Sequence, residues 1–181
     1  LFQNKNFKIG ADGNVATAGK NAGPDGVEGT YDDGLPATYA QFENLITYIR
    51  TKTKVIPFAY AADAMAYPAR IMTNYIADYD GKEAFNVNYN LNGKINIVTA
   101  SSPYTVEEVT ITQDNGYLLQ KDEGKYQALS FMKDIMLGNT GNISNLSGNA
   151  SFRTTQANFI IGSSNGTGKD FAFLCDGVWW A

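Results

Sequence analysis

The sequence predicts an α+β fold dominated by β-structure: an antiparallel meander or sandwich with two or three short helices and an extended N-terminal arm. Three observations support this fold class. Apolar and polar residues alternate between residues 84 and 119, the period of strands with one buried face. Glycine and asparagine divide the second half of the chain into short segments. Charged residues make up only 18% of the 181 residues, and neutral hydrogen-bonding side chains take their place.

The composition limits the chemistry that the chain can perform. There is no histidine, so the usual general base near neutral pH and the commonest zinc ligand are missing. We therefore expect no enzyme, and the remaining catalytic alternative is a glycosidase that uses paired carboxylates alone. The net charge is −4 and the basic residues are scattered, so we expect no nucleic-acid partner. No apolar run reaches the roughly 18 residues that span a membrane.

The sequence predicts a loop-rich N-terminal arm over residues 1–36 and a single α+β domain over residues 37–181. The arm is rich in glycine and poor in large apolar side chains. Alone it cannot offset the roughly 1 to 2 kcal/mol per residue that ordering a backbone costs. We expect the arm to be mobile in an isolated subunit, and Phe2, Phe7 and Ile9 to dock against a neighbouring chain when the arm is ordered.

Acidic residues gather in one glycine-rich stretch of this arm. They are Asp25, Glu28, Asp32 and Asp33. Two interpretations stay open: solvated turns, or a calcium site in which carboxylate and carbonyl oxygens surround the cation. The spacing does not match an EF-hand loop. Residues 23–33 resemble acidic glycine-rich loops of bacterial extracellular proteins, including calcium-binding pseudopilins, and this resemblance implies calcium as the one candidate cofactor.

Two helices are expected before the alternating region. After Pro36, large apolar residues recur at spacings of three and four, which predicts a helix over residues 37–51. Residues 54–60 contain an internal proline and suit an edge strand or an extended connector. The spacing after Pro68 predicts a second helix of about ten residues that ends at Asp80 and Gly81.

The alternating region predicts two successive hairpins. In the first, over residues 84–99, a three-residue loop puts Gly93 in the left-handed bulge position. This register places Tyr89 opposite Ile95, Val87 opposite Ile97 and Phe85 opposite Thr99. In the second hairpin, residues 105–112 pair with residues 117–119, and Ile111 faces Leu119.

The last third of the chain combines one helix with short strands. Residues 126–136 fit a helix or a strand, and the spacing favours the helix. Residues 138–148 predict a surface loop. Four short strands are expected, at residues 150–154, 158–162, 170–175 and 178–181. The single cysteine, Cys175, has no internal disulfide partner, so we expect a buried structural thiol.

Three motifs near the C-terminus have a functional and a simpler interpretation. Residues 162–170 are similar to a phosphate-binding loop but lack its first glycine and its hydroxyl residue, which favours a hairpin loop. Four Asn-x-Ser/Thr sequons, at Asn142, Asn145, Asn149 and Asn165, are expected by chance in so polar a chain. The pair Trp179 and Trp180 would face opposite sides of a strand, which favours core and interface over a carbohydrate platform.

Three segments carry a resemblance to bacteriophage proteins. Residues 6–19, with their Asp-Gly-Asn-Val unit, resemble strand-turn units of tail-fibre and head-fibre proteins. Residues 141–151 look like the Gly-Asn-Ala-rich connectors of those proteins. Residues 169–180 are similar to the closing strands of phage fibre and capsid-decoration domains. The resemblance implies a non-enzymatic structural protein of the virion that binds capsid or sister subunits and forms a homo-oligomer. The alternative is an extracellular pilus or surface-filament protein whose acidic loop binds calcium.

Overall fold

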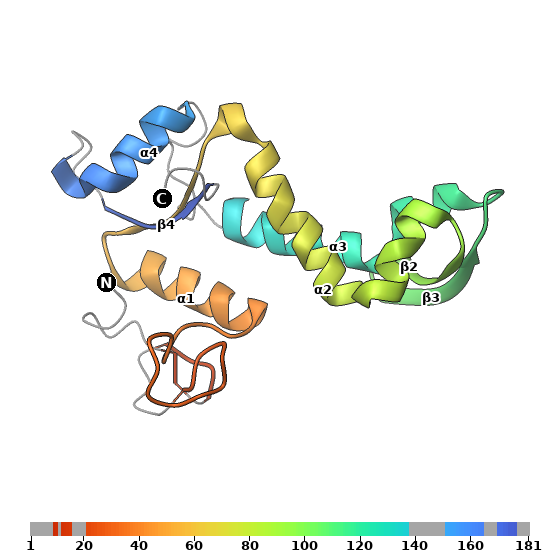
Figure 1. Cartoon of the computed structure of the whole chain (residues 1–181), viewed down its shortest axis with the longest axis horizontal. Helices are drawn as coiled ribbons and strands as arrows, with labels where there is room; N and C mark the ends of the chain where they lie inside the picture. The colour runs from red at the N-terminus through yellow and green to blue at the C-terminus, as the bar shows by residue number, and fades with distance from the viewer. Residues whose placement is uncertain (1–8, 11, 16–20, 138–150, 165–169, 177–181) are drawn as a thin grey trace. The chain divides into compact units, whose positions relative to one another are not determined.

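The computed structural model describes residues 9–10, 12–15, 21–137, 151–164 and 170–176. Within these ranges the protein is α+β and helix-rich, with 52% helix and 21% strand. The prediction of a β-dominated meander or sandwich is therefore wrong. The chain forms two compact units, which we call unit 1 (Leu1–Ala64 with Asp134–Ala181) and unit 2 (Met65–Lys133). Figure 1 shows their helices and strands.

Unit 1 contains the predicted first helix, α1 (Tyr39–Lys52). It begins at Thr38, whose side-chain oxygen accepts a hydrogen bond from the backbone N–H of Gln41 at 3.2 Å and so satisfies one free donor of the first turn. Its buried side chains are Leu45, Ile46 and Ile49, the apolar stripe that predicts the helix. The helix over residues 37–51 is confirmed.

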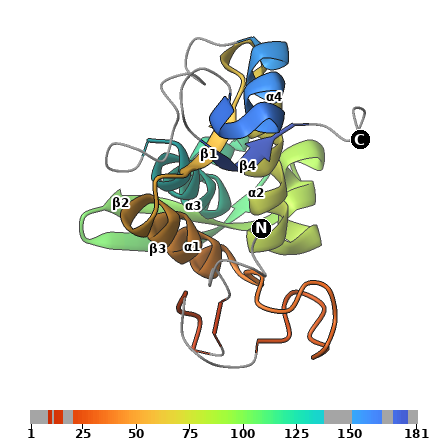
Figure 2. The same cartoon turned by 90° about the vertical axis from the view of Figure 1, so that its left-hand side faces the viewer.

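Two strands far apart in the chain form the sheet of unit 1. Strand β1 (Ile56–Tyr60) pairs in parallel with β4 (Phe171–Cys175), and the two lie side by side in Figure 2. Ile56 is opposite Phe171, and Tyr60 is opposite Cys175. The sequence predicts a strand over residues 170–175, and an edge strand or an extended connector over residues 54–60. A short 3-10 turn, η1 (Ala62–Ala64), follows β1.

Two of the four strands expected near the C-terminus are instead one helix, α4 (Phe152–Ile161), followed by a 3-10 turn, η4 (Gly162–Ser164). Ser151 caps the helix, because its hydroxyl accepts from the N–H of Thr154 at 3.3 Å, and Gly162 ends it at φ 60°. Since β4 pairs with β1, residues 162–170 connect a helix to a strand, and the hairpin-loop prediction is wrong. The expected loop at 138–148 and strand at 178–181 lie outside the described residues.

Ile9, assigned to a mobile arm by the sequence, is a core residue of unit 1. It has 0% exposure and packs with Leu45 and Ile49 of α1. Its N–H donates to the carbonyl of Gly34 at 2.7 Å, and it forms a β-bridge with Val15. The expectation that Ile9 docks against a neighbouring chain is therefore wrong, because its side chain is already used within the subunit. Phe2 and Phe7 lie outside the described residues.

Truncation of Ile9 should destabilise unit 1. We expect Ile9→Ala to lower the free energy of unfolding by about 2 to 4 kcal/mol, because it leaves a cavity beside Leu45 and Ile49. Urea denaturation followed by circular dichroism measures this loss. Val27→Ala is the matched control, since Val27 is 55% exposed and its truncation should change little. Equal midpoints for the two variants would contradict the core assignment of Ile9.

Unit 2 is built from two long helices and one hairpin. The helices are α2 (Ala66–Asn90) and α3 (Glu123–Met132). A π-helical turn, η3 (Lys133–Leu137), follows α3 in the chain, and all of it except Lys133 belongs to unit 1. Strands β2 (Gly93–Ser101) and β3 (Tyr104–Ile111) form an antiparallel ribbon, with Gly93 opposite Ile111 and Ser101 opposite Tyr104. A 3-10 helix, η2 (Gly116–Lys121), leads from the ribbon to α3. The helix favoured over residues 126–136 is confirmed.

The first predicted hairpin is wrong, because residues 84–90 belong to α2 and β2 pairs with β3. Phe85, Val87 and Tyr89 do alternate, but only Val87 is buried, and Tyr89 is 73% exposed. Val87 packs with Ala84 and Leu91 in the hydrophobic core of unit 2, at the spacings of three and four that a helix face requires. The helix ends at Leu91, which has a left-handed φ of 52°.

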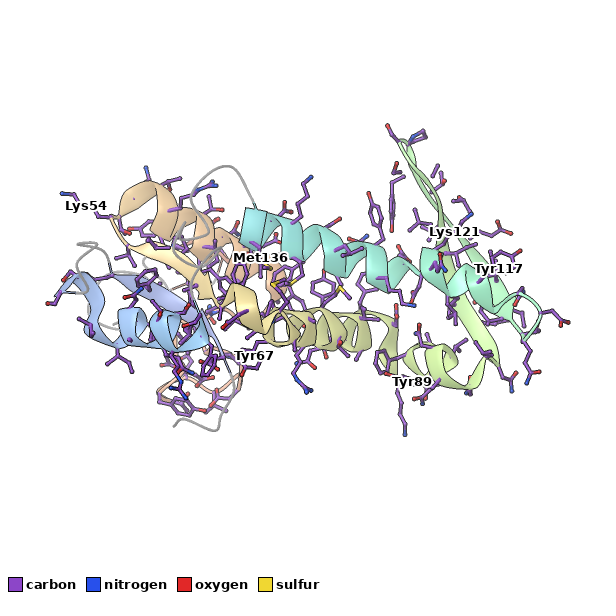
Figure 3. The ribbon with its side chains drawn as sticks, turned by 90° about the horizontal axis from the view of Figure 1, so that it is seen from above. Lys54, Tyr67, Tyr89, Tyr117, Lys121 and Met136 are labelled. Carbon is purple, nitrogen blue, oxygen red and sulfur yellow. The ribbon has the colours of Figure 1, made fainter. Side chains whose placement is uncertain are left out.

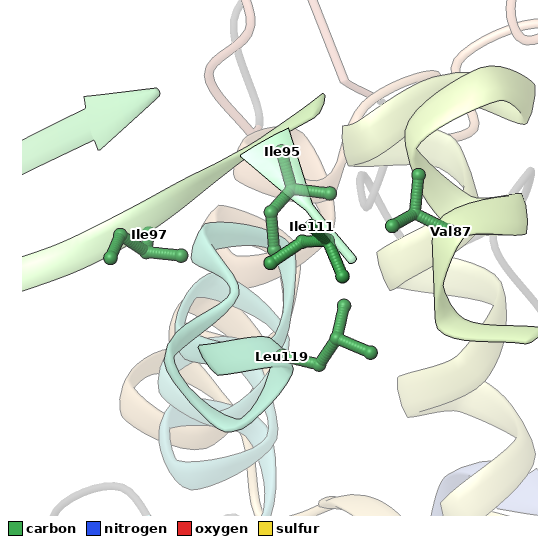
Figure 4. Packing of buried hydrophobic residues seen from close by; sticks show 5 residues of the cluster. All are labelled: Val87, Ile95, Ile97, Ile111 and Leu119. Carbon is green, nitrogen blue, oxygen red and sulfur yellow. The ribbon is translucent and has the colours of Figure 1, made fainter. Parts of the chain in front are cut away.

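The second predicted hairpin is also wrong in its pairing. Residues 116–121 are a 3-10 helix, so Ile111 and Leu119 are not strand partners. Both side chains nevertheless meet in the core of unit 2, which Figure 4 shows in close view. This core consists of Val87, Ile95, Ile97, Ile111 and Leu119.

Helix α2 is longer than the ten residues expected from the sequence, and it contains a break. Gly81 has φ 75° and ψ 171°, so two helical segments meet at this residue. Glycine adopts this backbone conformation without the steric cost that a Cβ brings. The break places Asp80 at the end of the first segment.

Candidate functional site

Three carboxyl groups come together inside unit 2, and we call Asp80, Asp122 and Glu123 the carboxyl cluster. Asp80 comes from the end of the first segment of α2. Asp122 is the N-cap of α3, where its carboxylate accepts from the N–H of Gly124 at 3.1 Å, and Glu123 is the first residue of that helix. Asp and Glu are favoured there because helix N-terminal N–H groups are free donors and carry partial positive charge. Asp122 and Glu123 are only 1% and 8% exposed.

Asp80 and Asp122 both have raised pKa values. Burial, followed by the charge of Asp122 and a hydrogen bond to it, raises the pKa of Asp80 from 3.8 to about 7. Burial also raises the pKa of Asp122. One buried oxygen of each group, Oδ2, has no ordinary hydrogen-bond donor among the described residues. A proton held by Asp80 and donated to Asp122 is consistent with these observations.

Lys125 supplies a positive charge that acts on both aspartates. Its ammonium donates to Oδ1 of Asn88 at 2.6 Å and to the carbonyl of Leu119 at 2.8 Å. Its charge acts to lower the pKa of both aspartates, against the larger effect of burial. One ammonium therefore acts on the half-buried Asp80 and on the buried Asp122.

Glu123 connects the hairpin to the helices. Its carboxylate accepts from Nδ2 of Asn96 on β2 at 3.1 Å and from the hydroxyl of Tyr104 on β3 at 2.7 Å. Tyr79 of α2 also hydrogen-bonds to it, and burial together with this bond raises the pKa of Tyr79 to about 12. Gln127 donates to the hydroxyl of Tyr104 at 3.0 Å. One buried carboxylate thus holds groups from α2, β2 and β3 at the start of α3.

The geometry of the carboxyl cluster suits a structural role better than hydrolysis. A glycosidase keeps its two carboxyls roughly 5 to 9.5 Å apart, with the sugar and water between them. Asp80 and Asp122 are in direct hydrogen-bond contact, and Asp122 is 1% exposed. The described ranges contain no group of three or more histidine, cysteine, aspartate or glutamate side chains placed to hold a metal ion.

The residues predicted as calcium ligands lie in turns of unit 1. Asp32 is buried and accepts hydrogen bonds from the N–H of Asp25 at 3.0 Å and from the hydroxyl of Thr30. These bonds, the Thr30 bond first, lower the pKa of Asp32. Asp33 accepts from the N–H of Gly29 at 2.8 Å. These carboxylates cap backbone donors of their own turns, and Glu28 is exposed.

The calcium site stays a prediction that a melting experiment tests. Binding to the native state alone stabilises by mass action, so millimolar calcium should raise the melting temperature if Asp25, Glu28, Asp32 and Asp33 close around the cation. Differential scanning calorimetry with calcium, and with magnesium at the same concentration as the control, measures this. An unchanged melting temperature would leave the hydrogen-bonded turns as the only role of these carboxylates.

Cys175 lies on β4 and is partly buried. Burial, followed by the nearby charge of Asp176, raises the pKa of its thiol to about 11. A thiol with so high a pKa carries almost no thiolate at neutral pH and is a poor nucleophile. The sequence predicts a buried structural thiol, and in the structure Cys175 has intermediate exposure.

The sequence analysis missed the carboxyl cluster. Its members are separated along the chain, and local density of acidic residues points to residues 25–33 instead. A weaker local signal exists, because Asp80 precedes Gly81, and Asp122 and Glu123 precede Gly124. Aspartate is a preferred residue at helix N-caps, and glycine often follows the last residue of a helix.

None of the helices in the described residues has the length and apolar character needed to cross a membrane. Comparison with known proteins found no matching family model, no matching curated protein and no matching solved structure.

Proposed function

We propose that the chain is a non-enzymatic structural protein that acts through protein–protein assembly, as a capsid-decoration or fibre component of a virion. The observation that carries the proposal is the β2–β3 hairpin, which continues beyond the core of unit 2. Its core contacts come from Ile95, Ile97 and Ile111. Residues 104–108 of β3 are exposed on both faces. An isolated ribbon of this kind is marginally stable in water, so contact with another protein would stabilise it.

Large exposed apolar side chains of unit 2 support the same proposal. On the hairpin these are Tyr104 and Val106, at 40% and 42% exposure. Elsewhere in the unit Tyr89 and Tyr117 are 73% and 69% exposed, and Figure 3 shows where they lie. Tyrosine is enriched in protein interfaces because it combines a large apolar surface with a hydrogen-bonding hydroxyl.

The virion assignment rests on the resemblance of three terminal segments to phage fibre and decoration proteins. Residues 9–10, 12–15, 151 and 170–176 of these segments lie in the described part of the chain. The alternative, an extracellular surface-filament protein, rests on the resemblance of residues 23–33 to acidic glycine-rich loops of bacterial extracellular proteins. Neighbouring portal or capsid genes would favour the virion, and neighbouring pilus genes the alternative.

Co-sedimentation of the purified full chain with capsids tests the proposed function. We expect the chain to self-associate or to sediment with capsids that lack it, and to show no activity on glycosides. Bovine serum albumin is the control for non-specific trapping. A monomer that neither self-associates nor binds capsids would contradict the proposal.

A further inference from the structure

The outer edge of β3 is the free edge of the hairpin. Strand β3 pairs with β2 on one side, and the described sheet contains only these two strands. The other edge of β2 is partly covered, because Ile97 forms a β-bridge with Asp122. Proteins usually block an exposed strand edge, since its free N–H and C=O groups invite another strand.

Asn115 shows which backbone groups of β3 face outward. Its side-chain amide donates to the carbonyl of Thr110 at 3.0 Å, and its side-chain oxygen accepts from the N–H of Thr112 at 2.7 Å. These two backbone groups therefore point away from β2. Backbone groups alternate in direction along an antiparallel strand, so those of Val106 and Glu108 also point outward. At this end of β3, the side chain of Asn115 makes the hydrogen bonds that a third strand would otherwise make.

Beyond Asn115 the edge is open. Residues 104–108 are exposed, and in the part of the chain that the structure describes no further strand pairs with this edge. This segment offers an incoming chain two outward N–H groups and two outward carbonyls. It has the length of a short added strand.

A second copy of β3 fits this edge poorly. In an antiparallel pairing of two β3 edges, a twofold axis at Glu107 or at Glu108 places that glutamate opposite its own copy, and an axis at Val106 places Glu107 diagonally beside Glu107 of the second copy. Like charges directly opposite each other destabilise a strand pair. Glu108 already has a cation, because its Oε2 lies 2.6 Å from Nζ of Lys94. The strand neighbours of Glu107 on its own face are uncharged: Thr105, Val109 and the opposite Ile97.

We propose that the outer edge of β3 binds an extended segment of a different protein as a third strand, with a lysine or arginine of that segment facing Glu107. This inference rests on the proposed function, since it names how the assembly contact is made. The backbone groups of Val106 and Glu108 supply the hydrogen bonds, and Glu107 selects the charge of the partner.

Two synthetic peptides test the charge preference. One is Thr-Val-Thr-Lys-Thr-Val-Thr, and the other carries glutamate in place of the lysine. By isothermal titration against the full chain we expect the lysine peptide to bind about fivefold more tightly or better. The charge-reversal variant Glu107→Lys should invert this preference. Equal affinities of the two peptides for wild type would overturn the role of Glu107.

A proline tests the strand addition itself. Val106→Pro removes an N–H that points away from β2, so the ladder with β2 should persist while the incoming strand loses a donor. We expect this variant to lose binding of the lysine peptide and of capsids. Val106→Thr keeps the N–H and should bind as wild type does, and circular dichroism shows whether both variants are folded.

The outcomes separate this inference from the proposed function. If Val106→Pro and Glu107→Lys are folded and join capsids as wild type does, the β3 edge is not the contact, although assembly stands. If wild type itself does not assemble, the proposed function fails. If wild type is a dimer and Val106→Pro is a monomer, the occupant is a second copy, and the inference of a different partner is overturned.

Discussion

Replacing Asp80 with asparagine should reduce the pH dependence of the stability of unit 2 between about pH 4 and pH 8. The pKa of Asp80 is raised from 3.8 to about 7 by burial and by Asp122. The folded state therefore binds this proton more tightly than the unfolded state does. The resulting stabilisation is complete below the unfolded pKa and is lost as the pH rises through about 7. Asparagine donates to Asp122 at every pH, so the variant avoids this loss.

Urea denaturation of the full chain at several pH values measures the effect. The full pKa shift corresponds to about 4 kcal/mol, but Asp80 is only half-buried, and solvent screening reduces the expected difference to about 1 to 2 kcal/mol. At about pH 8 the Asp80→Asn variant should be more stable than wild type by this amount, and near pH 5 the two should be similar. The charged residues that act on Asp80 are the same in wild type and in the variant: Asp122, Glu123 and Lys125.

Asp114→Asn is the matched control, because it removes an exposed carboxyl from the same unit without touching the cluster. This control should keep the pH dependence of wild type. A variant Asp80→Asn that loses stability with rising pH just as wild type does would show that Asp80 and Asp122 do not share a proton.

Replacing Gly124 with alanine should destabilise unit 2 by about 2 to 3 kcal/mol. A Cβ at this position would lie 2.6 Å from Cγ of Asp80 and closer still to Oδ1. The carboxyl of Asp80 would have to move away from Asp122, which is itself anchored by the N–H of Gly124. In an open helix the same change would stabilise by up to about 1 kcal/mol, so the sign of the effect distinguishes close packing from propensity.

A double-mutant cycle assigns this loss to the contact with Asp80. In the background of Asp80→Ala, which removes the clashing atoms, Gly124→Ala should cost much less than in wild type. Denaturation midpoints of the four proteins give the coupling energy. If the cost of Gly124→Ala is the same in both backgrounds, the destabilisation has another origin.

Helix caps and apolar spacing, which are read from neighbouring residues, predict helix α1 correctly. Helix α1 has a cap at Thr38 and an apolar stripe through Leu45 and Ile49, and both the helix and its buried face are found. The strand segments around residues 54–60 and 170–175 are also correct. Their parallel pairing is not predictable in the same way, because nothing near either strand specifies a partner so far along the chain.

The wrong secondary-structure predictions arise where the same residues fit both the period of a strand and the period of a helix. Phe85, Val87 and Tyr89 alternate as in a strand, while Ala84, Val87 and Leu91 recur as in a helix, and packing against β2 and β3 decides for the helix. The same ambiguity affects α4. The carboxyl cluster depends on the fold itself, because it forms only when the break at Gly81 brings the end of one helical segment to the N-cap of α3.

The chain order of the two units has a consequence for synthesis on the ribosome. Unit 2 is one continuous segment, Met65–Lys133, placed between the two parts of unit 1. When residue 133 has emerged, unit 2 is complete, whereas β1 still lacks β4, which begins at Phe171. We expect unit 2 to fold first. Its folding shortens the effective length of the loop between β1 and β4, so less chain entropy is lost when these two strands pair. Until then the apolar side chains of Phe58 and Tyr60 have no strand beside them, so the nascent chain is most prone to aggregate during this interval.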